Sequence, residues 1–196
     1  MDFNFFALIS RMRYIARWGL MRNALPENIQ EHSHMVAVLA HALGVIRRDI
    51  FHQPCDVNAL ATAALYHDAS EILTGDLPTP IKYHNAEIMS AYHAVEDLAV
   101  QKLLGMLPPE LRATYADVLA EDKGGSIYPL VKAADKLSAY IKCIEERKAG
   151  NNEFLSAEAQ TRAALDASPL PEVQYFLEHF IPAFERDLDE LGAIGQ

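Results

Sequence analysis

Apolar residues recur every three or four positions along most of the chain, which is the spacing of one face of an α-helix. A clear example is the stripe of Val36, Leu39, Leu43 and Ile46. No stretch shows a convincing alternation of apolar and polar residues, as a half-buried strand would. We therefore predict an all-α fold, with helices over about residues 3–17, 28–50, 57–73, 85–106, 109–122, 128–148, 153–167 and 172–191.

Glycine and proline mark where these helices end. Thr74-Gly75 predicts a C-terminal stop, because glycine readily adopts the conformation that closes a helix. We expect the following segment, Asp76-Leu77-Pro78-Thr79-Pro80, to be non-helical, since each proline restricts itself and the residue before it. No internal repeat, low-complexity tract or long linker divides the chain. The expected organisation is a single domain over residues 1–196.

Composition and charge narrow the class of protein. Hydrophobic residues make up 51% and charged residues 22% of the 196 positions, which is typical of a globular chain. A net charge of −10 argues against binding to a nucleic acid polymer, which needs a basic surface. There is no apolar run long enough to span a membrane and no pattern of a signal peptide. With only two cysteines, at no metal-type spacing, we expect a cytoplasmic protein.

Ionisable residues interrupt the apolar face of the helix predicted over residues 57–73. Leu60, Ala64, His67 and Glu71 follow at spacings of four, three and four, so they share one face. Asp68 belongs to the adjoining stripe. A buried, unpaired carboxylate costs several kcal/mol, so these positions need a cation or hydrogen bonds. Asp68 and Glu71 could instead form a solvated polar edge of the helix.

Two further residues of the same types lie on other predicted helices. His32 continues the apolar stripe that begins at Val36, and Asp135 lies beside a core stripe. Singly, each has an ordinary explanation, since a lone histidine on such a stripe is more often a hydrogen-bonded core residue. Asp135 could pair with Lys132 or face solvent. Together with His67 and Asp68, however, they provide two imidazoles and two carboxylates, a set that suits one divalent ion such as Mn²⁺, Fe²⁺, Co²⁺ or Zn²⁺.

The ordered set His32, His67-Asp68 and Asp135 resembles the H…HD…D pattern of HD-domain metal-dependent phosphohydrolases. More specific segments, and similarity over nearly the whole chain, resemble the bacterial 5′-deoxynucleotidases of the YfbR type. These segments are Arg17-Trp18, Glu31-His32-Ser33, His67-Asp68-Ala69-Ser70-Glu71 and Gly75-Asp76-Leu77-Pro78-Thr79-Pro80.

The resemblance implies an HD-type helical bundle with a metal site in its interior. It implies hydrolysis of deoxyribonucleoside 5′-monophosphates, with selection against ribonucleotides, by a homodimer that binds one divalent ion. The implied metal ligands are His32, His67, Asp68 and Asp135. The implied catalytic residues are Glu71, Asp68 and Arg17. The implied substrate contacts are Arg17, which would orient the phosphate, Trp18, His32, Asp68, Asp76, Leu77, Pro78, Thr79 and Asp135.

Three alternatives remain open from the residues alone. Another HD-type reaction, such as hydrolysis of a deoxynucleoside triphosphate or a guanosine alarmone, would use the same metal site but would need more basic residues than Arg17. In a non-catalytic nucleotide-binding regulator the metal site would be vestigial, and the presence of every ligand together with Glu71 argues against this reading. A purely structural helical protein would bind no metal. Arg17 could equally form a helix-surface ion pair, Trp18 could be ordinary core packing, and the proline-rich segment could be a rigid connector.

Overall fold

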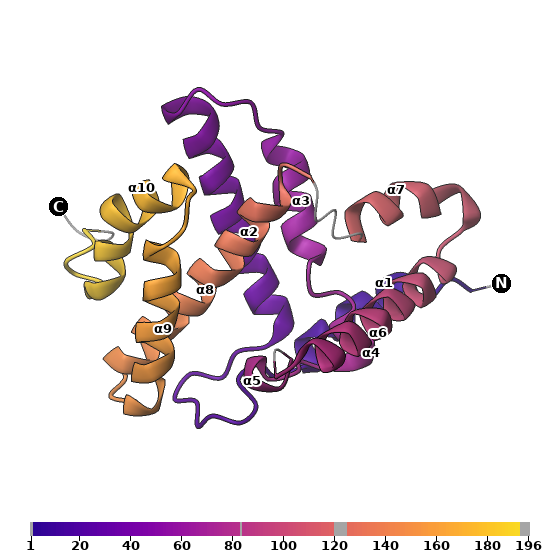
Figure 1. Cartoon of the computed structure of the whole chain (residues 1–196), viewed down its shortest axis with the longest axis horizontal. Helices are drawn as coiled ribbons and strands as arrows, with labels where there is room; N and C mark the ends of the chain where they lie inside the picture. The colour runs from indigo at the N-terminus through magenta and orange to yellow at the C-terminus, as the bar shows by residue number, and fades with distance from the viewer. Residues whose placement is uncertain (1, 83, 120–124, 193–196) are drawn as a thin grey trace.

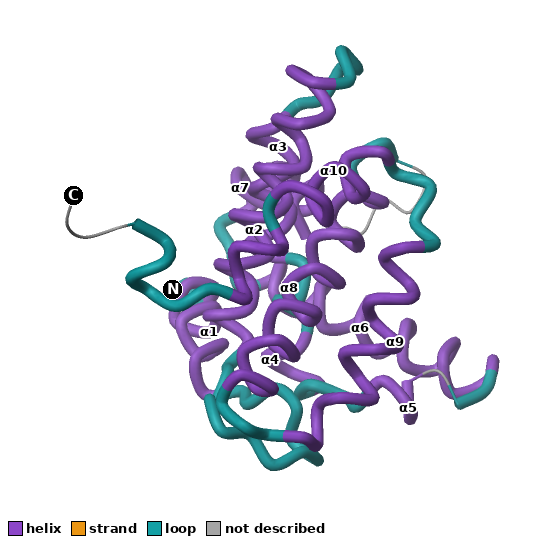
Figure 2. The backbone as a smooth tube through the Cα atoms, turned by 90° about the vertical axis from the view of Figure 1, so that its left-hand side faces the viewer, coloured by secondary structure: helices purple, strands orange, loops and turns teal. Residues whose placement is uncertain are grey.

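The computed structural model describes residues 2–82, 84–119 and 125–192. Throughout these ranges the regular structure is helical, apart from one isolated antiparallel bridge between Ala16 and Asn28 (Figure 2). The all-α prediction is therefore confirmed. None of the described helices combines the length and apolar character needed to cross a membrane.

The N-terminal segment forms two short helices rather than the single helix predicted over residues 3–17. They are α1, Phe5–Ile9, and the 3-10 helix η1, Ser10–Tyr14. The helical conformation ends before Arg17 because Ile15 turns to an extended backbone, with φ −97° and ψ 108°. Ile15 then accepts a hydrogen bond from the backbone N–H of Ile29 at 3.0 Å, which pairs this segment with the start of α2.

The second predicted helix is present from Ile29 to Ile50 in two conformations. α2, Ile29–Val45, is α-helical, and its last turn continues as the π-helix η2, Ile46–Ile50. Asn28 begins α2 through a capping box, since its side chain accepts hydrogen bonds from the N–H groups of Gln30 and Glu31 while Glu31 reaches back to the N–H of Asn28. This cap fixes the direction in which the first turn of α2 faces.

The prediction of one continuous helix over residues 57–73 is wrong, and the interruption falls at residues of the site. α3, Val57–Tyr66, ends before His67, a turn covers residues 67–70, and the short α4, Glu71–Thr74, follows. In the turn the N–H of Ala69 bonds to the carbonyl of Tyr66 and the N–H of Glu71 to that of Asp68. These tighter bonds replace the α-helical ones. Gly75, at φ 73°, closes α4 where a stop was predicted.

The proline-rich segment is only partly non-helical, against our prediction. Residues 76–78 are an irregular loop, but Thr79–Lys82 form the short helix α5. Pro80 is the second residue of α5, where a missing backbone N–H costs nothing because the first turn has no partner for it. Pro80 is therefore compatible with the short helix α5, and the irregular loop ends before Thr79.

The remaining elements follow the predicted order. α10 ends earlier than the predicted Leu191, because Pro182 cannot donate the next helical hydrogen bond. The end predicted for the fifth helix near Asp122 lies outside the described residues. The elements are α6, Ala86–Gly105; α7, Pro109–Leu119; α8, Tyr128–Lys148; the 3-10 helix η3, Asn152–Phe154; α9, Leu155–Asp166; α10, Pro171–His179; and the 3-10 helix η4, Ile181–Glu185.

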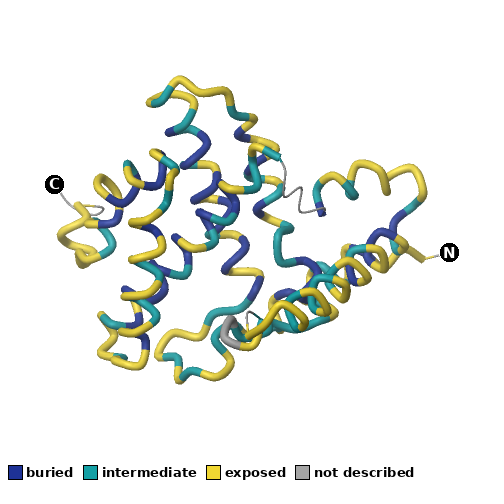
Figure 3. The backbone as a smooth tube through the Cα atoms, viewed as in Figure 1, coloured by how far each residue is buried: buried dark blue, intermediate teal, exposed yellow. Residues whose placement is uncertain are grey.

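Buried side chains form two groups, and the helices that contribute to each group lie on different sides of the molecule in Figure 1, with α9 and α10 on the left and α1, α6 and α7 on the right. The larger group joins α2, α3, α8, α9 and α10, and Figure 3 shows buried positions along the facing sides of α2, α3 and α8. It includes Phe176 and Ile181 of the apolar C-terminal segments, while Phe180 is 45% exposed. The smaller group joins α1, α6 and α7 around Phe5 and Leu107. Residues 67–71 connect the two groups, since α3 belongs to the first and Ala69 to the second.

Candidate metal and active site

Two histidines and two aspartates converge where α2, α8 and the turn after α3 meet. The Nε2 atom of His32 lies 3.1 Å from Oδ1 of Asp135 and 3.5 Å from Oδ2 of Asp68. The Nε2 atom of His67 lies 3.1 Å from Oδ2 of Asp68. Potential ligand atoms of His32, His67 and Asp135 all lie within 4.8 Å of one another. The structure therefore brings together the four residues that the sequence predicted as ligands.

The local structure explains how these side chains reach one place. The capping box at Asn28 puts His32 on the inner side of the first turn of α2, where it is fully buried. His67 follows the last residue of α3 with helical backbone angles, φ −58° and ψ −31°, and begins the turn at residues 67–70. On a continuous helix these neighbours would diverge by about 100°. Both side chains can therefore reach one point only between their two directions, and the distances of Oδ2 of Asp68 from Nε2 of His67 and of His32 show that they do.

Nε2 of each imidazole faces the cluster, and a hydrogen bond at Nδ1 fixes the orientation of the ring. Nδ1 of His67 donates to the backbone carbonyl of Ala64 at 2.8 Å, and Nδ1 of His32 forms a hydrogen bond with Oγ of Ser138 at 3.2 Å. Both Nε2 atoms are buried and have no hydrogen-bond partner among the described residues, although carboxylate oxygens lie close by. Metal-binding histidines have this arrangement, with one nitrogen fixed by a second partner and the other left as a ligand.

The charges of the cluster favour a positive ion. Burial alone would raise the pKa of Asp68, but the imidazoles of His67 and His32 and the Arg17 guanidinium hold it well below its usual range. Burial likewise opposes ionisation of Asp135, and the two imidazoles hold its pKa well below its usual range. Conversely, both carboxylates raise the pKa of His67 against the effect of its burial. Two ionised carboxylates and two oriented imidazoles fit a divalent cation.

Glu71 lies one turn from the cluster with a different electrostatic environment. Its side chain is 7% exposed, and its Oε2 atom has no hydrogen-bond partner among the described residues. Burial, reinforced by the negative charges of Asp68 and Asp76, raises the pKa of Glu71 to about 10. Asp68 and Glu71 therefore differ in charge, although only two residues separate them along the chain. Such divergent carboxyl groups are typical of acid–base sites.

Arg17 and Trp18 lie on the loop between η1 and α2, and Arg17 reaches the cluster at Asp68. The Nη1 atom of Arg17 lies 3.5 Å from Oδ2 of Asp68, and its Nε donates to Oε2 of Glu27 at 3.0 Å. The indole N–H of Trp18 donates to the same oxygen at 3.1 Å. Burial opposes the charge of Arg17, but the neighbouring carboxylates, Asp68 foremost, raise its pKa. Sequence reasoning missed Glu27, because its residue type and spacing carry no signal for a contact formed by a folded loop.

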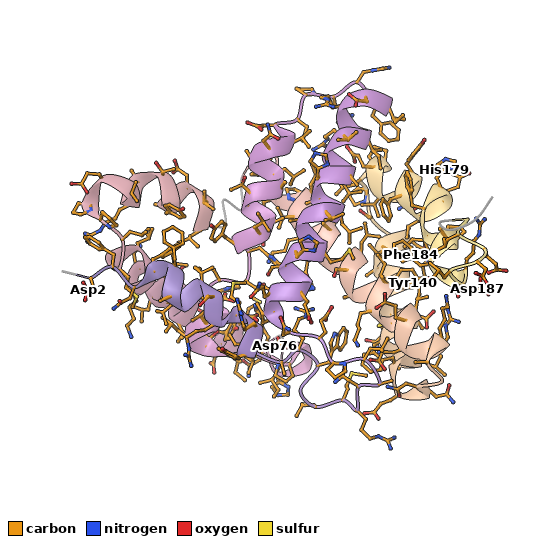
Figure 4. All side chains as sticks on the ribbon, turned by 180° about the vertical axis from the view of Figure 1, so that it is seen from behind. Asp2, Asp76, Tyr140, His179, Phe184 and Asp187 are labelled. Carbon is orange, nitrogen blue, oxygen red and sulfur yellow. The ribbon has the colours of Figure 1, made fainter. Side chains whose placement is uncertain are left out.

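The loop after α4 brings Asp76 to Trp18. Burial raises the pKa of Asp76 above its usual range, and the Arg17 guanidinium and the backbone N–H of Trp18 oppose this rise. In Figure 4, Asp76 lies where the N-terminal helices approach the start of α2, away from Tyr140 and Phe184 on the C-terminal side. Leu77 and Pro78 are half-buried in this loop. The side chain of Thr79 lies outside the described residues.

Comparison with known proteins agrees with this geometry. The family model for YfbR-like 5′-deoxynucleotidases matches residues 4–184. The chain belongs to this family. 5′-Deoxynucleotidase YfbR of Shigella boydii and that of Escherichia coli are each 49% identical to it over 190 residues, which cover 96% of both chains.

Solved structures place this YfbR-like chain among HD-domain folds. An HD-domain phosphohydrolase from Listeria innocua superposes with a TM-score of 0.82 at 24% identity, covering 94% of this chain and 90% of that one. The HD phosphohydrolase DatZ of cyanophage S-2L, bound to dA and one catalytic Zn²⁺ ion, superposes with a TM-score of 0.58 at 26% identity, covering 94% and 96%. These relatives and the histidine–aspartate cluster support a divalent metal site in the interior of the helical bundle.

Proposed function

We propose that this chain, acting as one domain over residues 1–196, is a metal-dependent 5′-deoxynucleotidase. It hydrolyses deoxyribonucleoside 5′-monophosphates to a deoxynucleoside and inorganic phosphate. One observation carries the proposal. The two buried Nε2 atoms of His32 and His67, without hydrogen-bond partners in the described structure, meet the carboxylates of Asp68 and Asp135 in a chain that is 49% identical to YfbR enzymes.

His32, His67, Asp68 and Asp135 would hold the metal. When bound, a divalent ion lowers the pKa of a coordinated water and neutralises charge on a phosphoryl oxygen. Two nitrogen and two carboxylate ligands suit Co²⁺, Mn²⁺, Fe²⁺ or Zn²⁺, and leave positions for water and substrate. We propose one such ion per chain. Metal content and reconstitution with each ion would identify the one that supports activity.

Arg17 and Glu71 would act on the phosphate. The planar guanidinium of Arg17 can donate paired hydrogen bonds to phosphate oxygens, which orients the group for attack. Asp68, next to both His67 and Arg17, can align the attacking water. Glu71 is buried one turn away, and its unpartnered Oε2 is available to transfer a proton without binding the metal. His32, Asp68 and Asp135 would also contact the substrate.

The nucleoside would lie between Trp18 and the loop after α4. Asp76 would accept a hydrogen bond from the 3′-hydroxyl, and residues 77–79 would contact the nucleoside. Pro78 restricts the backbone of this loop, which lowers the entropy lost on binding. The indole of Trp18 would leave no room for a 2′-hydroxyl and so select deoxyribose.

Phosphate release from all deoxyribonucleoside and ribonucleoside 5′-monophosphates, with each divalent metal, tests the activity. We expect release from deoxynucleotides that EDTA abolishes and metal restores. Asp68→Ala should lose both bound metal and turnover, because it removes a proposed ligand. Deoxynucleoside triphosphates serve as the comparison substrates for the alternative HD reaction. If no 5′-deoxynucleotide releases phosphate with any metal, the proposed activity is wrong.

Sugar selection has its own test. Trp18→Ala should raise kcat/KM for ribonucleotides relative to deoxyribonucleotides, because it opens space for the 2′-hydroxyl. A fold-change of about ten in this ratio is the size that one removed steric clash produces. The ratio of kcat/KM for dAMP and AMP measures it. An unchanged ratio in a folded variant would exclude Trp18 as the selector.

Two further properties belong to the proposal. We propose a homodimer, because symmetric dimers are the commonest assembly and α6 exposes Val95 and Leu98. Sedimentation of the purified protein at several concentrations would test it. We also propose a cytoplasmic location, which fractionation of cells producing the protein would test.

A further inference from the structure

The loop from Ile15 to Asn28 is folded back on itself, so that its two ends lie side by side. Ala16 and Asn28 form an isolated antiparallel bridge, and the N–H of Arg17 donates to the carbonyl of Glu27 at 3.0 Å. Glu27 is therefore opposite Arg17, although nine residues separate them in the chain. The backbone pairing delivers the Glu27 side chain to the residues predicted to bind the substrate.

One oxygen of Glu27 then serves two donors. Oε2 accepts from Nε of Arg17 at 3.0 Å and from the indole N–H of Trp18 at 3.1 Å. The side chains of Arg17 and Glu27 are only 12% and 16% exposed, so water competes weakly for these bonds. Because the guanidinium is planar, a bond at Nε fixes the plane of the whole group and leaves its terminal nitrogens for the phosphate side.

Trp18 needs such support. Its backbone has φ 57°, the left-handed region, which is strained for a bulky side chain. Strained residues persist where several contacts determine their position. Here the indole N–H donates to Glu27, the ring centroid lies 5.2 Å from that of Phe154, and the Trp18 carbonyl accepts the N–H of Met21 at 2.8 Å.

We propose that Glu27 is a positioning residue whose single carboxylate fixes the Arg17 guanidinium and the Trp18 indole relative to each other. The inference rests on the proposed function, in which Arg17 orients the phosphate and Trp18 selects the sugar. Through Glu27, recognition of the phosphate and recognition of the deoxyribose become one preformed arrangement. Without Glu27, the guanidinium is free to turn towards Asp68, whose Oδ2 lies 3.5 Å from Nη1.

Two substitutions separate the hydrogen bonds of Glu27 from its charge. Glu27→Ala removes both, while Glu27→Gln keeps an acceptor oxygen and removes the charge. Glu153→Gln is the matched control, because Glu153 pairs with Arg22 of the same loop at 2.8 Å. Arg22 is 92% exposed and is not part of the proposed site.

Trp18 is the only tryptophan, so its fluorescence reports directly on its position. We expect Glu27→Ala to shift the emission to longer wavelength and to increase quenching by acrylamide, with a smaller change in Glu27→Gln. We expect kcat/KM for dAMP to fall at least tenfold in Glu27→Ala and two- to fivefold in Glu27→Gln. The dAMP-to-AMP ratio of kcat/KM should fall in both, and Glu153→Gln should stay within twofold of the wild type in every measurement.

Circular dichroism and thermal unfolding identify variants that keep the fold. A folded Glu27→Ala with unchanged emission, quenching and substrate ratio overturns the inference. An equal loss on dAMP and AMP with unchanged fluorescence also overturns it, because it indicates a general structural effect. If Glu27→Ala does not fold, Glu27→Gln decides by the same criteria. If the wild type cleaves no nucleotide, the proposed function fails, while fluorescence still decides whether Glu27 holds Trp18.

Discussion

Asp68 is the residue through which the charges of the site are connected. Its Oδ2 atom lies 3.1 Å from His67, 3.5 Å from His32 and 3.5 Å from Arg17. A substitution at Asp68 therefore disturbs both the proposed metal ligands and Arg17, the residue proposed to bind the phosphate. This is why Asp68→Ala tests the metal site but cannot separate metal binding from catalysis.

Glu71 allows that separation. We predict that Glu71→Gln and Glu71→Ala keep bound metal but lower kcat by about 100-fold or more, the range that acid–base groups contribute. The reason is that the Glu71 carboxyl is buried beside the cluster, and among the described residues no ion pair joins it to His32 or His67, whereas Asp68 lies close to both. Metal content by elemental analysis, with kcat on dAMP, measures both properties. A variant that keeps full turnover would remove Glu71 from the mechanism.

The types of the cluster residues conflict with their surroundings, and the resemblance to the HD-domain pattern selected them as one set of ligands. Histidine and aspartate on apolar stripes need an explanation, and a cation provides one. Glu27 and Ser138 gave no such signal, since a glutamate before a helix cap and a serine within a helix are ordinary. Their roles come from distances across the fold, 3.0 Å to Arg17 and 3.2 Å to His32, which no local pattern encodes.

At the scale of elements, the turn at residues 67–70, which carries His67 and Asp68, is the feature of the site that the apolar spacing did not predict. The apolar spacing from Leu60 to Ile72 continues through this turn, so periodicity alone predicted one uninterrupted helix. The order of the helices and most of their ends followed from apolar spacing, glycine and proline. Short turns inside a helical pattern did not, because tertiary contacts decide them.

The loop over residues 75–78 is tied to α6 at both ends by Tyr92. The Tyr92 hydroxyl lies 3.5 Å from Oγ1 of Thr74, at the end of α4, and its ring lies 4.5 Å from Nζ of Lys82, at the end of α5. Lys82 also pairs with Glu96 at 2.9 Å. One aromatic side chain therefore holds the two short helices that flank the loop carrying Asp76.

We predict that Tyr92→Ala raises KM for dAMP about tenfold with a smaller change in kcat, because a looser loop binds the nucleoside less well. Tyr92→Phe keeps the ring beneath Lys82 and loses only the Thr74 contact, so its KM should change less than threefold. Steady-state kinetics of both variants gives the comparison. Equal KM values for Tyr92→Ala and the wild type would exclude this role.

Gly44 lets α2 and α3 pack closely. A Cβ atom at Gly44 would lie 2.9 Å from Cδ2 of Leu60, which is fully buried, and 3.4 Å from Sγ of Cys55. Overpacking of this kind costs about 1–3 kcal/mol, and alanine regains about 1 kcal/mol of helix propensity. We predict a net loss of stability for Gly44→Ala, measured by urea unfolding. Gly105→Ala in α6, with nothing within 4 Å, is the control and should not be destabilised.

At the scale of the whole molecule, a buried ion pair in α8 binds the loop between Ile15 and Asn28 to that helix. Glu146 is fully buried, accepts the N–H groups of Ala24 and Leu25 at 2.8 and 3.0 Å, and pairs with Lys142. Lys142 also donates to the carbonyl of Leu25. This contact holds the loop that carries Arg17 and Trp18 against the helix that carries Asp135. The stability of the fold and the geometry of the site therefore depend on the same carboxylate.

Burial opposes the charge of Glu146, but hydrogen bonds from Lys142, Asn151 and the loop lower its pKa to about 2. In the unfolded chain a glutamate has a pKa of about 4.3. The ionised state thus contributes stability above about pH 4.3, and this contribution is lost as the pH falls towards 2. The shift corresponds to about 3 kcal/mol at neutral pH.

We predict that Glu146→Gln is less stable than the wild type at pH 7 and that the difference narrows between pH 5 and pH 3. Urea unfolding at a series of pH values measures it. Glu185→Gln, which removes an exposed partner of Arg147, should keep the wild-type dependence on pH. The fluorescence of Trp18 in Glu146→Gln should also change at pH 7, because the loop is released from α8. Parallel stability curves for Glu146→Gln and the wild type would show that the ionised carboxylate does not secure the loop.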